Sequence, residues 1–484
     1  MLVFIAQKMY CIKFILIPNR KPMKLQKKKP VELEIIDLAF GGKGLAKPDG
    51  YPIFVDRTVP GDTIIARITR KKKSFAEARL VSIEKPSPLR KVPTCKYADH
   101  CGGCRWQTLG YGTQLEYKQR HVIESLEHIG LLKGIEVLPV ISSKKIFEFR
   151  NKMEFSCTTN RWLMPEELEN PDIKKGFGLG LHVPGTFDRI LDIDRCLIQP
   201  DMGNEIMEHV RRYILASGVP AYGLRSHEGF WRFLMLRSSS AFKTWMVNIV
   251  TKEENDALLI PLAQTLKKTF PSIVSIVNNV TAKKAGIATG EYENLLLGER
   301  FIREKLGRFT FEISANSFFQ TNTTGAEQLY SLVSEYADLK GYETVVDLYS
   351  GTGTIPIWLS DRAKKVVGIE IVESAVIDAR KNATLNDIKN CEFFVGDIKD
   401  VLPGLDASCD VMIIDPPRVG MHKDVVAQVL SIAPPRIIYV SCNPATLARD
   451  LGMLKERYRV VKVQPVDMFP HTFHIESVAL LEAL

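Results

Sequence analysis

Three side chains that could take part in catalysis lie near the ends of predicted strands. Asp415 ends the strand DVMIID, and Cys442 ends the next strand, IIYVS. The carboxyl ends of such strands are where open α/β sheets bind ligands. Cys442 also precedes a helix-forming segment, whose positive end should lower the pKa of the thiol and favour the nucleophilic thiolate. Glu476, in FPHTFHIESVALL, is a carboxylate that could remove a proton from a covalent adduct.

A second set of residues forms a candidate nucleotide site. In VVDLYSGTG, residues 345–353, an acidic residue ends a strand and glycines precede a helix, where they allow close approach of a ligand. Glu370 ends the strand VVGIE and could accept hydrogen bonds from ribose hydroxyls, and Asp397 ends CEFFVGD where an adenine could bind. The spacing fits a dinucleotide or S-adenosylmethionine. Because the third glycine expected for a pyrophosphate is missing, S-adenosylmethionine is favoured.

A cysteine cluster indicates a metal site. Cys95, Cys101 and Cys104 occur within ten residues in CKYADHCGGCRWQ. Thiolates this close in sequence can bind a soft metal, and either a four-iron cluster or a tetrahedral zinc needs a fourth ligand. Cys196 is the preferred fourth ligand and Cys157 is the alternative. The spacing differs from the paired C-x2-C of zinc ribbons, which favours iron. The remaining cysteines have no partners nearby and are interpreted as structural or incidental: Cys11, Cys391 and Cys409.

The elements that position the catalytic residues alternate between strand and helix after Ser314. Apolar strands such as VVGIEI, DVMIID and RIIYVS are separated by helical patterns, which predicts a parallel sheet with helices on both faces. The sequence therefore predicts an α/β, Rossmann-like domain over residues 313–484. A mixed α+β region over residues 87–312 precedes it and contains the cysteine cluster.

The front of the chain predicts strands only. VELEIIDLA, YPIFVDRTV, DTIIARITR and FAEARLVSI are separated by Gly and Pro turns, which is typical of a small five-stranded barrel, here over residues 23–86. Residues 1–90 hold 19 Lys and Arg against 8 Asp and Glu, a net charge of +11, whereas the whole chain carries +9. This asymmetry favours a nucleic-acid partner, with a solvated spacer as the alternative.

The first residues match neither a signal peptide nor a membrane span. The apolar runs of Met1 to Pro18 are broken by polar and charged residues and precede no small-residue cleavage site. We expect a disordered extension over residues 1–22, with Met23 as an alternative start. The nine sparse cysteines indicate a reducing compartment, and we expect a cytoplasmic protein without contact to a membrane.

Three motifs together resemble one family. DPPR, SCNPATLARD and FPHTFHIES, in this order behind VVDLYSGTG, resemble the RNA uracil-5-methyltransferase family. GGKGLA and VPGD are placed as in a TRAM domain, an OB-like RNA-binding module. With the cysteine cluster, they make the chain similar to the branch of the family that modifies 23S rRNA and carries an iron–sulfur cluster. The resemblance covers roughly residues 24–484.

The resemblance implies both an activity and its residues. The thiolate of Cys442 would add to C6 of a uracil, so that C5 attacks the methyl sulfonium of S-adenosylmethionine. Glu476 would then remove the C5 proton before elimination. RNA, most specifically 23S rRNA, would be the partner of a monomeric enzyme. The pocket for cofactor and uracil would contain Gln320, Tyr349, Gly351, Glu370, Asp397 and Asp415. A [4Fe–4S] cluster with a structural or RNA-positioning role would be held by Cys95, Cys101, Cys104 and Cys196.

The chain departs from the family pattern at several positions. Tyr349 and Ser350 stand where family members often have Phe-Cys, and Thr354 stands where Asn is frequent. A cofactor contact from Thr354 is therefore not expected. Residues 161–175 form a longer segment than usual, which could alter substrate contacts.

Three alternative functions fit parts of the sequence. The same chemistry could act on tRNA, although the tRNA-specific relatives generally lack the barrel and the cysteine cluster. Radical S-adenosylmethionine enzymes also carry TRAM domains, but they use C-x3-C-x2-C, whereas the first gap here is five residues. A non-catalytic RNA-binding protein could retain the fold, but the presence of Cys442, Glu476 and Asp415 together argues against it.

Overall fold

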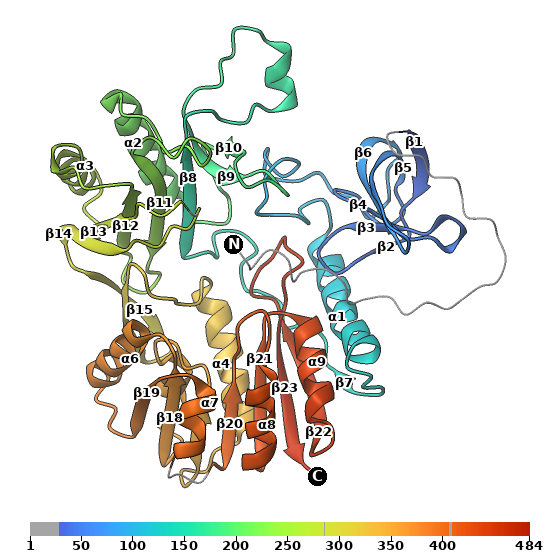
Figure 1. Cartoon of the computed structure of the whole chain (residues 1–484), viewed down its shortest axis with the longest axis vertical. Helices are drawn as coiled ribbons and strands as arrows, with labels where there is room; N and C mark the ends of the chain where they lie inside the picture. Colours follow the sequence, from blue (N-terminus) through green and yellow to red (C-terminus); the bar gives the residue numbers. More distant parts are fainter. Residues whose placement is uncertain (1–28, 285, 406–408) are drawn as a thin grey trace.

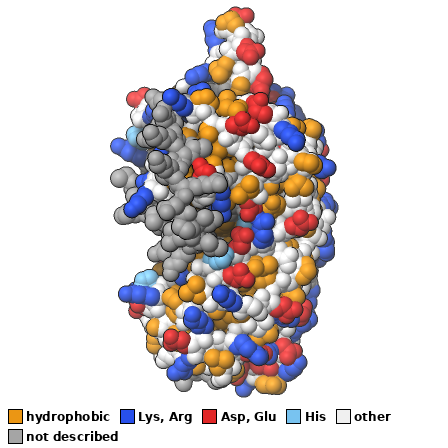
Figure 2. Space-filling view, turned by 90° about the vertical axis from the view of Figure 1, so that its right-hand side faces the viewer, with side chains coloured by type: hydrophobic (Ala, Val, Ile, Leu, Met, Phe, Trp, Pro, Cys, Tyr) orange, Lys and Arg blue, Asp and Glu red, His pale blue; other side chains and the backbone are white. Residues whose placement is uncertain are grey.

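The computed structural model describes residues 29–284, 286–405 and 409–484 (Figure 1). The predicted extension over residues 1–22 and the alternative start at Met23 lie outside these residues. Residues 1–28 also carry 7 of the 19 basic side chains among the first 90 residues and no acidic one. Most of the predicted positive charge therefore lies outside the described residues. On the face shown in Figure 2, the described Lys and Arg side chains are scattered among acidic and hydrophobic ones.

The first sheet is formed by residues 30–85. Apolar and polar residues alternate along its strands, so that Ile64, Ala66 and Ile68 point to one side and are buried. The strand order is β1-β5-β6-β4-β3-β2, with all pairs antiparallel except β4 with β6. The four predicted segments form strands, with VELEIIDLA divided into two, and a further strand after the glycine turn gives six strands in place of the predicted five. They are β1 (Pro30–Glu34), β2 (Asp37–Leu38), β3 (Gly44–Ala46), β4 (Ile53–Val55), β5 (Thr63–Lys71) and β6 (Ala76–Lys85).

The middle of the chain forms a seven-stranded sheet, in the order β10-β9-β8-β11-β12-β13-β14. Along β11, Leu234 and Leu236 pack into the core that contains α2 and α3, whereas Phe233 and Met235 belong to a smaller cluster on the opposite face. The strands are β8 (Lys152–Thr158), β9 (Gly178–His182), β10 (Ile190–Asp192), β11 (Trp231–Ser238), β12 (Trp245–Thr251), β13 (Ile273–Val280) and β14 (Tyr292–Gly298). The helices are α2 (Asp201–Ser217) and α3 (Asp256–Thr269).

Two segments of this region stand apart from the sheet. The cysteine loop, residues 95–104, contains neither helix nor strand, as predicted. The segment of residues 161–175, predicted to be longer than usual, projects from the body of the protein and contains a short 3-10 helix at Pro165–Glu169 (Figure 1).

The C-terminal part is an eight-stranded sheet, in the order β19-β18-β17-β20-β21-β23-β22-β7. The strands from β19 to β21 are parallel to one another, and β23 is antiparallel to both of its neighbours. The strands are β17 (Thr344–Asp347), β18 (Lys365–Glu370), β19 (Cys391–Val395), β20 (Val411–Ile414), β21 (Arg436–Ser441), β22 (Tyr458–Val466) and β23 (Glu476–Ala483). The helices are α4 (Thr323–Ala337), α5 (Thr354–Leu359), α6 (Glu373–Leu385), α7 (Ile398–Val401), α8 (Lys423–Ile432) and α9 (Pro444–Leu454).

Both faces of this sheet are covered, as the apolar strands predict. Val345, Ile413 and Ile438 pack into one core, whereas Val346 and Met412 pack into another on the opposite face. The predicted Rossmann-like fold is therefore confirmed. No helix of the described residues is long and apolar enough to cross a membrane.

The C-terminal sheet also takes in elements that lie before residue 313. Helix α1 (Tyr111–His128) packs against α9, and β7 (Glu136–Val137) pairs in parallel with β22. A hairpin of β15 (Phe301–Leu306) and β16 (Phe309–Ser314) leads into α4. The region predicted as a separate central unit therefore contributes to the body that carries Cys442.

Candidate active site

Cys442 and Glu476 lie at adjoining strand ends. Strands β21 and β23 are antiparallel, and Ser441 with Ser477 is the last pair of their register. Cys442 directly follows β21, Glu476 begins β23, and the charge of Glu476 acts on the thiol of Cys442. Asp415 follows β20, the other neighbour of β21. The fold therefore brings the three predicted reacting residues to one edge of the sheet, formed by the carboxyl ends of β20 and β21 and the amino end of β23.

The carboxyl groups of Glu476 and Asp415 release their protons less readily than ordinary carboxyl groups, because their pKa values are raised. Glu476 is buried, and burial together with the charge of Asp415 raises the pKa of Glu476 to about 8, although Arg418 opposes this shift. Burial also raises the pKa of Asp415 to about 7. Both groups therefore exchange protons near neutral pH, which is the range in which a general acid or base is useful.

The prediction of a lowered pKa for Cys442 is wrong for the ligand-free protein. Burial, and then the charge of Glu476, raise the pKa of this thiol to about 11. Arg418 forms a hydrogen bond with the thiol and lowers its pKa, but by less than these two effects raise it. Helix α9 begins only at Pro444, and its first turn is capped by the side chain of Asn443. The thiol therefore needs a nearby proton acceptor to become a nucleophile.

A pocket beside these residues contains three of the predicted cofactor residues. It has a volume of about 410 Å³ and lies between the ends of β17, β18 and β20. Tyr349, Glu370 and Asp397 line it, together with apolar side chains such as Ile371 and Ile398. An apolar pocket with a few polar groups suits a nucleoside.

The glycine turn fixes the carboxylate of Glu370. The N–H of Gly351 donates to Oε2 of Glu370 at 3.1 Å, and the N–H of Val372 donates to Oε1 at 2.9 Å. Gly353 has φ +78°, and a Cβ atom there would lie 3.0 Å from both Ala379 and Phe393. Both the backbone conformation and the tight packing at Gly353 therefore favour glycine, and the close approach of a ligand to this turn stays a prediction.

Two buried polar atoms at this turn lack a partner. Oδ2 of Asp347 and Oγ of Ser350 are buried and make no hydrogen bond. Burial raises the pKa of Asp347 to about 8. Unpaired buried polar atoms are costly, so these atoms fit a site for a polar or cationic ligand, as the amino acid part of S-adenosylmethionine would provide. Asp347 was recognised from the sequence only as an acid at a strand end and was not assigned a role.

Gln320 lies near the acids but does not line this pocket. It is in the segment between β16 and α4, and its side chain forms a hydrogen bond with the hydroxyl of Tyr330. The same hydroxyl lies 3.0 Å from Oγ1 of Thr354, and its pKa is raised by burial and by the charges of Asp415 and Asp347. Thr354 is therefore already engaged within the protein. Tyr330 was missed because a tyrosine on an amphipathic helix is usually a core residue.

Two residues within the family-like motifs were also missed. Arg418, the last residue of DPPR, forms a hydrogen bond with Cys442 and lowers the pKa of Glu476. His474, in FPHTFHIES, packs against the ring of Phe473, and burial lowers the pKa of this histidine to about 3. His474 is therefore neutral at physiological pH. In both cases, the place of the residue within a family-like motif was the sequence signal that could have identified it.

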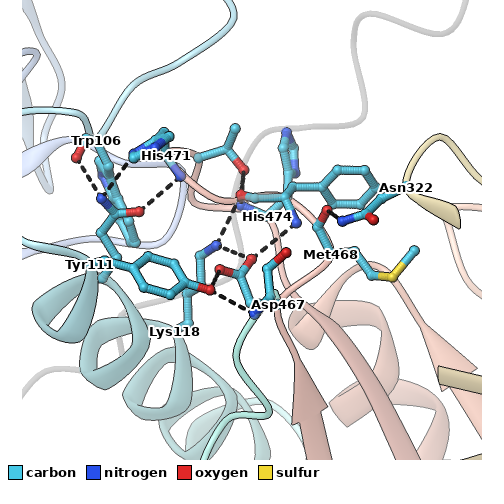
Figure 3. Close-up of polar contacts among 12 residues, drawn as sticks. Trp106, Tyr111, Lys118, Asn322, Asp467, Met468, His471 and His474 are labelled. Carbon is cyan, nitrogen blue, oxygen red and sulfur yellow. Dashed lines mark hydrogen bonds and ion pairs between the residues drawn. The ribbon is translucent and has the colours of Figure 1, made fainter. Parts of the chain in front are cut away.

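The loop before Glu476, residues 467–475, is held by a buried polar network (Figure 3). Nζ of Lys118 in α1 lies 2.7 Å from Oδ1 of Asp467, and both side chains are fully buried. The hydroxyl of Tyr111 donates to the other carboxylate oxygen at 2.9 Å, and Lys118 also donates to the carbonyl of Phe469. The start of the loop is therefore fixed to α1.

The middle of the loop is fixed by backbone contacts. His471 has φ +65°, an uncommon conformation for a residue other than glycine. Its N–H donates to Gln114 of α1 at 2.9 Å, and its carbonyl accepts from the N–H groups of Arg105 and Trp106. Asn322 donates to the carbonyl of Met468. The base candidate Glu476 is thus positioned by three segments that lie far from it in sequence.

Removal of Lys118 should test this network. Lys118→Met leaves the charge of Asp467 buried and unpaired, which should lower the free energy of unfolding by about 3–5 kcal/mol. Urea denaturation would measure it. The double variant Lys118→Met with Asp467→Asn, which removes both charges, should recover part of the loss. A Lys118→Met protein as stable as the wild type would contradict the role of this pair.

The four predicted cluster cysteines are gathered in one hydrophobic core. Burial, together with the charges of nearby Cys196, Cys101 and Cys95, raises the pKa of Cys104 to about 12. The pKa of Cys157 also rises to about 12, but it responds to burial and to Arg211. The structure thus brings Cys196, rather than Cys157, into the electrostatic range of the other three thiols. Within the described residues, however, no group of three or more His, Cys, Asp or Glu is arranged to hold a metal ion.

The fold and the site define a class of protein. A Rossmann-like sheet with a glycine turn, a carboxylate fixed at that turn and an apolar pocket at its carboxyl edge is that of an S-adenosylmethionine-dependent methyltransferase. Residues 345–431 match the family described as "Methyltransferase domain", and residues 398–484 match the family described as "tRNA (Uracil-5-)-methyltransferase".

Similar proteins identify the family. The chain is 41% identical to an "uncharacterized RNA methyltransferase" of Porphyromonas gingivalis, over 93% of this chain and 99% of the relative. It is 40% identical to another of the same description from Chlorobaculum tepidum, over 96% and 98%. The crystal structure of the Pyrococcus abyssi tRNA (uracil-54, C5)-methyltransferase with S-adenosyl-L-homocysteine is similar at 32% identity and a TM-score of 0.73, over 93% of this chain and all of that one. The chain belongs to the RNA uracil-5-methyltransferase family.

Proposed function

We propose that this enzyme methylates C5 of a uridine in 23S rRNA through a covalent bond between Cys442 and C6 of the uracil. The observation that carries the proposal is that Cys442, at the end of β21, lies within the electrostatic range of the buried Glu476, at the start of the adjacent β23. S-adenosylmethionine, when bound, supplies a methyl group on a sulfonium. Tyr349, Gly351, Glu370 and Asp397 would hold its nucleoside, and Asp347 would meet its amino group. Gln320 and Asp415 would face the uracil.

The protein's own groups provide the proton transfers. Cys442 must lose its proton before its sulfur bonds to C6, and Asp415, with a pKa near neutrality, is the nearby acceptor that leaves Glu476 free for the later step. The electron pair pushed to C5 then takes up the methyl group. Glu476 removes the C5 proton, the C5–C6 double bond re-forms, and the bond between C6 and sulfur breaks. Charge is conserved in each step, and the last step releases the thiolate of Cys442.

A tRNA substrate is the second candidate, and one observation favours it. The Pyrococcus abyssi tRNA enzyme aligns over 93% of this chain. The argument that tRNA enzymes lack the barrel and the cysteine region therefore does not hold for this relative. The 23S rRNA proposal rests on the motifs and the cysteine cluster. Mass spectrometry of 23S rRNA and tRNA from a deletion strain would test it: loss of 5-methyluridine from 23S rRNA, restored by the gene, is the expected result.

We further propose three functional units, with the TRAM unit over residues 23–86, the iron–sulfur unit over 87–312 and the methyltransferase unit over 313–484. The VPGD motif supports the first. Asp62 is fully buried, accepts hydrogen bonds from the N–H groups of Val59 and Ser87 and pairs with Arg90. This motif therefore closes the first sheet at the point where the chain leaves it.

The four cysteines are proposed to hold a [4Fe–4S] cluster. The ligand sulfurs of such a cluster lie farther apart than those around a single ion, so the thiols need not converge on one point. Arg150 fits this proposal, because its charge lowers the pKa of Cys196 and the thiols in turn stabilise its charge. The cluster would have a structural or RNA-positioning role, since the methyl transfer needs no electron.

Two cysteine variants should show whether Cys196 or Cys157 is the fourth ligand of the cluster. Cys196→Ala should lose iron and acid-labile sulfide, because it removes one of four thiolates. Cys157→Ala changes an equally buried thiol outside the set and should retain both. Iron and sulfide analysis of anaerobically purified protein would measure this. Retention of iron in Cys196→Ala together with its loss in Cys157→Ala would reverse the assignment, and zinc in place of iron would contradict the cluster.

A further inference from the structure

A pair of positive side chains near the active site has no acidic partner. Lys152 of β8 and Arg237 of β11 are direct cross-strand partners, so their side chains emerge side by side on one face of the sheet. This is the face that carries Phe233 and Met235, opposite to the face covered by α2 and α3. Like charges placed directly opposite each other destabilise a sheet. An arrangement of this kind calls for an explanation outside the folding of the strands.

Hydrogen bonds do not satisfy these cations. Arg237 is only 4% exposed, and its Nη2 donates to the carbonyl of Ser317 at 2.9 Å, but its Nη1 is buried without any partner. Arg150, just before β8, uses Nε to donate to the carbonyl of Lys152 at 2.9 Å. None of the three cations forms an ion pair with a described carboxylate; Glu154, on the same strand and exposed, is the acid whose charge reaches Arg150 and Lys152. A buried donor left unpaired costs about 1–3 kcal/mol.

The electrostatics agree with an uncompensated site. Burial, and then the charge of Arg237, lower the pKa of Lys152 to about 8. Burial lowers the pKa of Arg150 and Arg418 adds to this effect, whereas the charges of Cys196, Cys104 and Glu154 oppose it. The free protein therefore keeps these cations close together at a cost, which an anion bound between them would offset.

The cations lie next to the place where the uracil must react. Asn151, between Arg150 and Lys152, donates from its side chain to the carbonyl of Gln320 at 3.0 Å, and its N–H donates to the carbonyl of Thr321. Arg237 binds the same segment through Ser317. On the other side, Arg150 is within electrostatic range of Arg418, which contacts Cys442. The cations thus border the segment that contains Gln320, and Arg418 connects them electrostatically with Cys442.

We propose that Arg150, Lys152 and Arg237 form a binding site for a backbone phosphate of the RNA strand, adjacent to the reactive uridine. This inference rests on the proposed function, because an RNA substrate brings a phosphate to either side of the uracil. Phosphate contacts fix the register of a nucleic acid on a protein without reading its sequence. The site would therefore place the uridine over Cys442 whatever bases flank it.

The test uses Lys152→Gln and, as a control, Lys389→Gln, which removes an exposed lysine near the amino end of β19, on the opposite edge of the C-terminal sheet. Binding of a fluorescent twelve-nucleotide oligouridylate to the full-length protein is measured over a series of salt concentrations. Lys152→Gln should bind roughly 5- to 20-fold more weakly, with a slope of log affinity against log salt reduced by about 0.7, the value for one phosphate of a single strand. Lys389→Gln should match the wild type.

A stability measurement separates binding from folding. Because Lys152→Gln removes repulsion from Arg237, its melting temperature should equal or exceed that of the wild type, while its RNA affinity falls. Three results would each overturn the proposal. Lys152→Gln could keep the wild-type affinity and salt slope, or it could lose affinity together with a lower melting temperature. The wild type could also fail to bind the oligonucleotide at low salt. Formation of the covalent adduct by the wild type is scored separately, so the phosphate site can fail while the proposed methylation stands.

Discussion

Cys442→Ala should abolish methyl transfer, with a fall in rate by a factor on the order of 10⁴ or more, as is found when the nucleophile of a covalent mechanism is removed. Without the thiol, no bond to C6 forms and C5 of the uracil stays unreactive. The fold should be retained, because Cys442 is only partly buried and contributes no core contact. RNA binding should also be unchanged.

Denaturing electrophoresis with RNA that contains 5-fluorouracil would measure this. Fluorine at C5 replaces the proton that the base removes, so the wild-type protein should remain bound to the RNA and migrate as a shifted band in the presence of S-adenosylmethionine. Cys442→Ala should give no shifted band. Cys391→Ala is a matched control, since Cys391 lies on the edge strand β19, far from the carboxyl edge of β21 in sheet order. A shifted band that persists in Cys442→Ala would exclude this cysteine as the nucleophile.

The sequence predicted that Asp415 and Cys442 lie close together because each stands at the end of a parallel strand, whereas the roles of Cys442 and Glu476 followed from the resemblance to a family. In a parallel sheet, successive β–α units deliver their carboxyl ends to one edge, so Asp415 and Cys442 had to meet. The pairing of Cys442 with Glu476 has a different origin. It depends on the antiparallel return of β23 beside β21, which brings the first residue of β23 to the end of β21. Only the motif order, and no periodicity, indicated that the two belong together.

Other features were not predictable because they depend on long-range burial. Lys118 stands on an amphipathic helix and would be read as a surface residue, yet it forms a buried pair with Asp467, 349 positions away. The error in the pKa of Cys442 has the same cause. A helix start can be recognised locally, whereas the burial of the thiol and the charge of Glu476 exist only in the folded protein. Strand β7, two residues long, is likewise specified by its partner β22.

The raised pKa of Glu476 links catalysis to stability. The ordinary pKa of a glutamate carboxyl group, which applies in the unfolded chain, is 4.5, whereas the pKa of Glu476 in the folded protein is about 8. Between these values the folded protein retains a proton that the unfolded chain releases, so stability falls as the pH rises through this window and levels off above about pH 8. Glu476→Gln cannot ionise and should not show this loss. Its free energy of unfolding at pH 9 should exceed that of the wild type, by up to a few kcal/mol.

Glu476→Gln should form the covalent adduct and methylate it but fail to release the product. The glutamine amide cannot accept the C5 proton, so elimination stops and the adduct with ordinary uridine RNA should accumulate, with turnover lower by about 10²–10⁴-fold. In the wild type, product release should rise with pH as Glu476 ionises near pH 8, whereas the residual rate of Glu476→Gln should not follow this titration.

Loss of the negative charge should also lower the pKa of Cys442, so iodoacetamide should alkylate this thiol faster in the ligand-free variant. Quenched-flow analysis of adduct and product at several pH values would measure these steps. Turnover of Glu476→Gln at the wild-type rate would show that another group removes the proton, and Asp415, the other carboxyl group at this edge with a raised pKa, would then be the residue to replace.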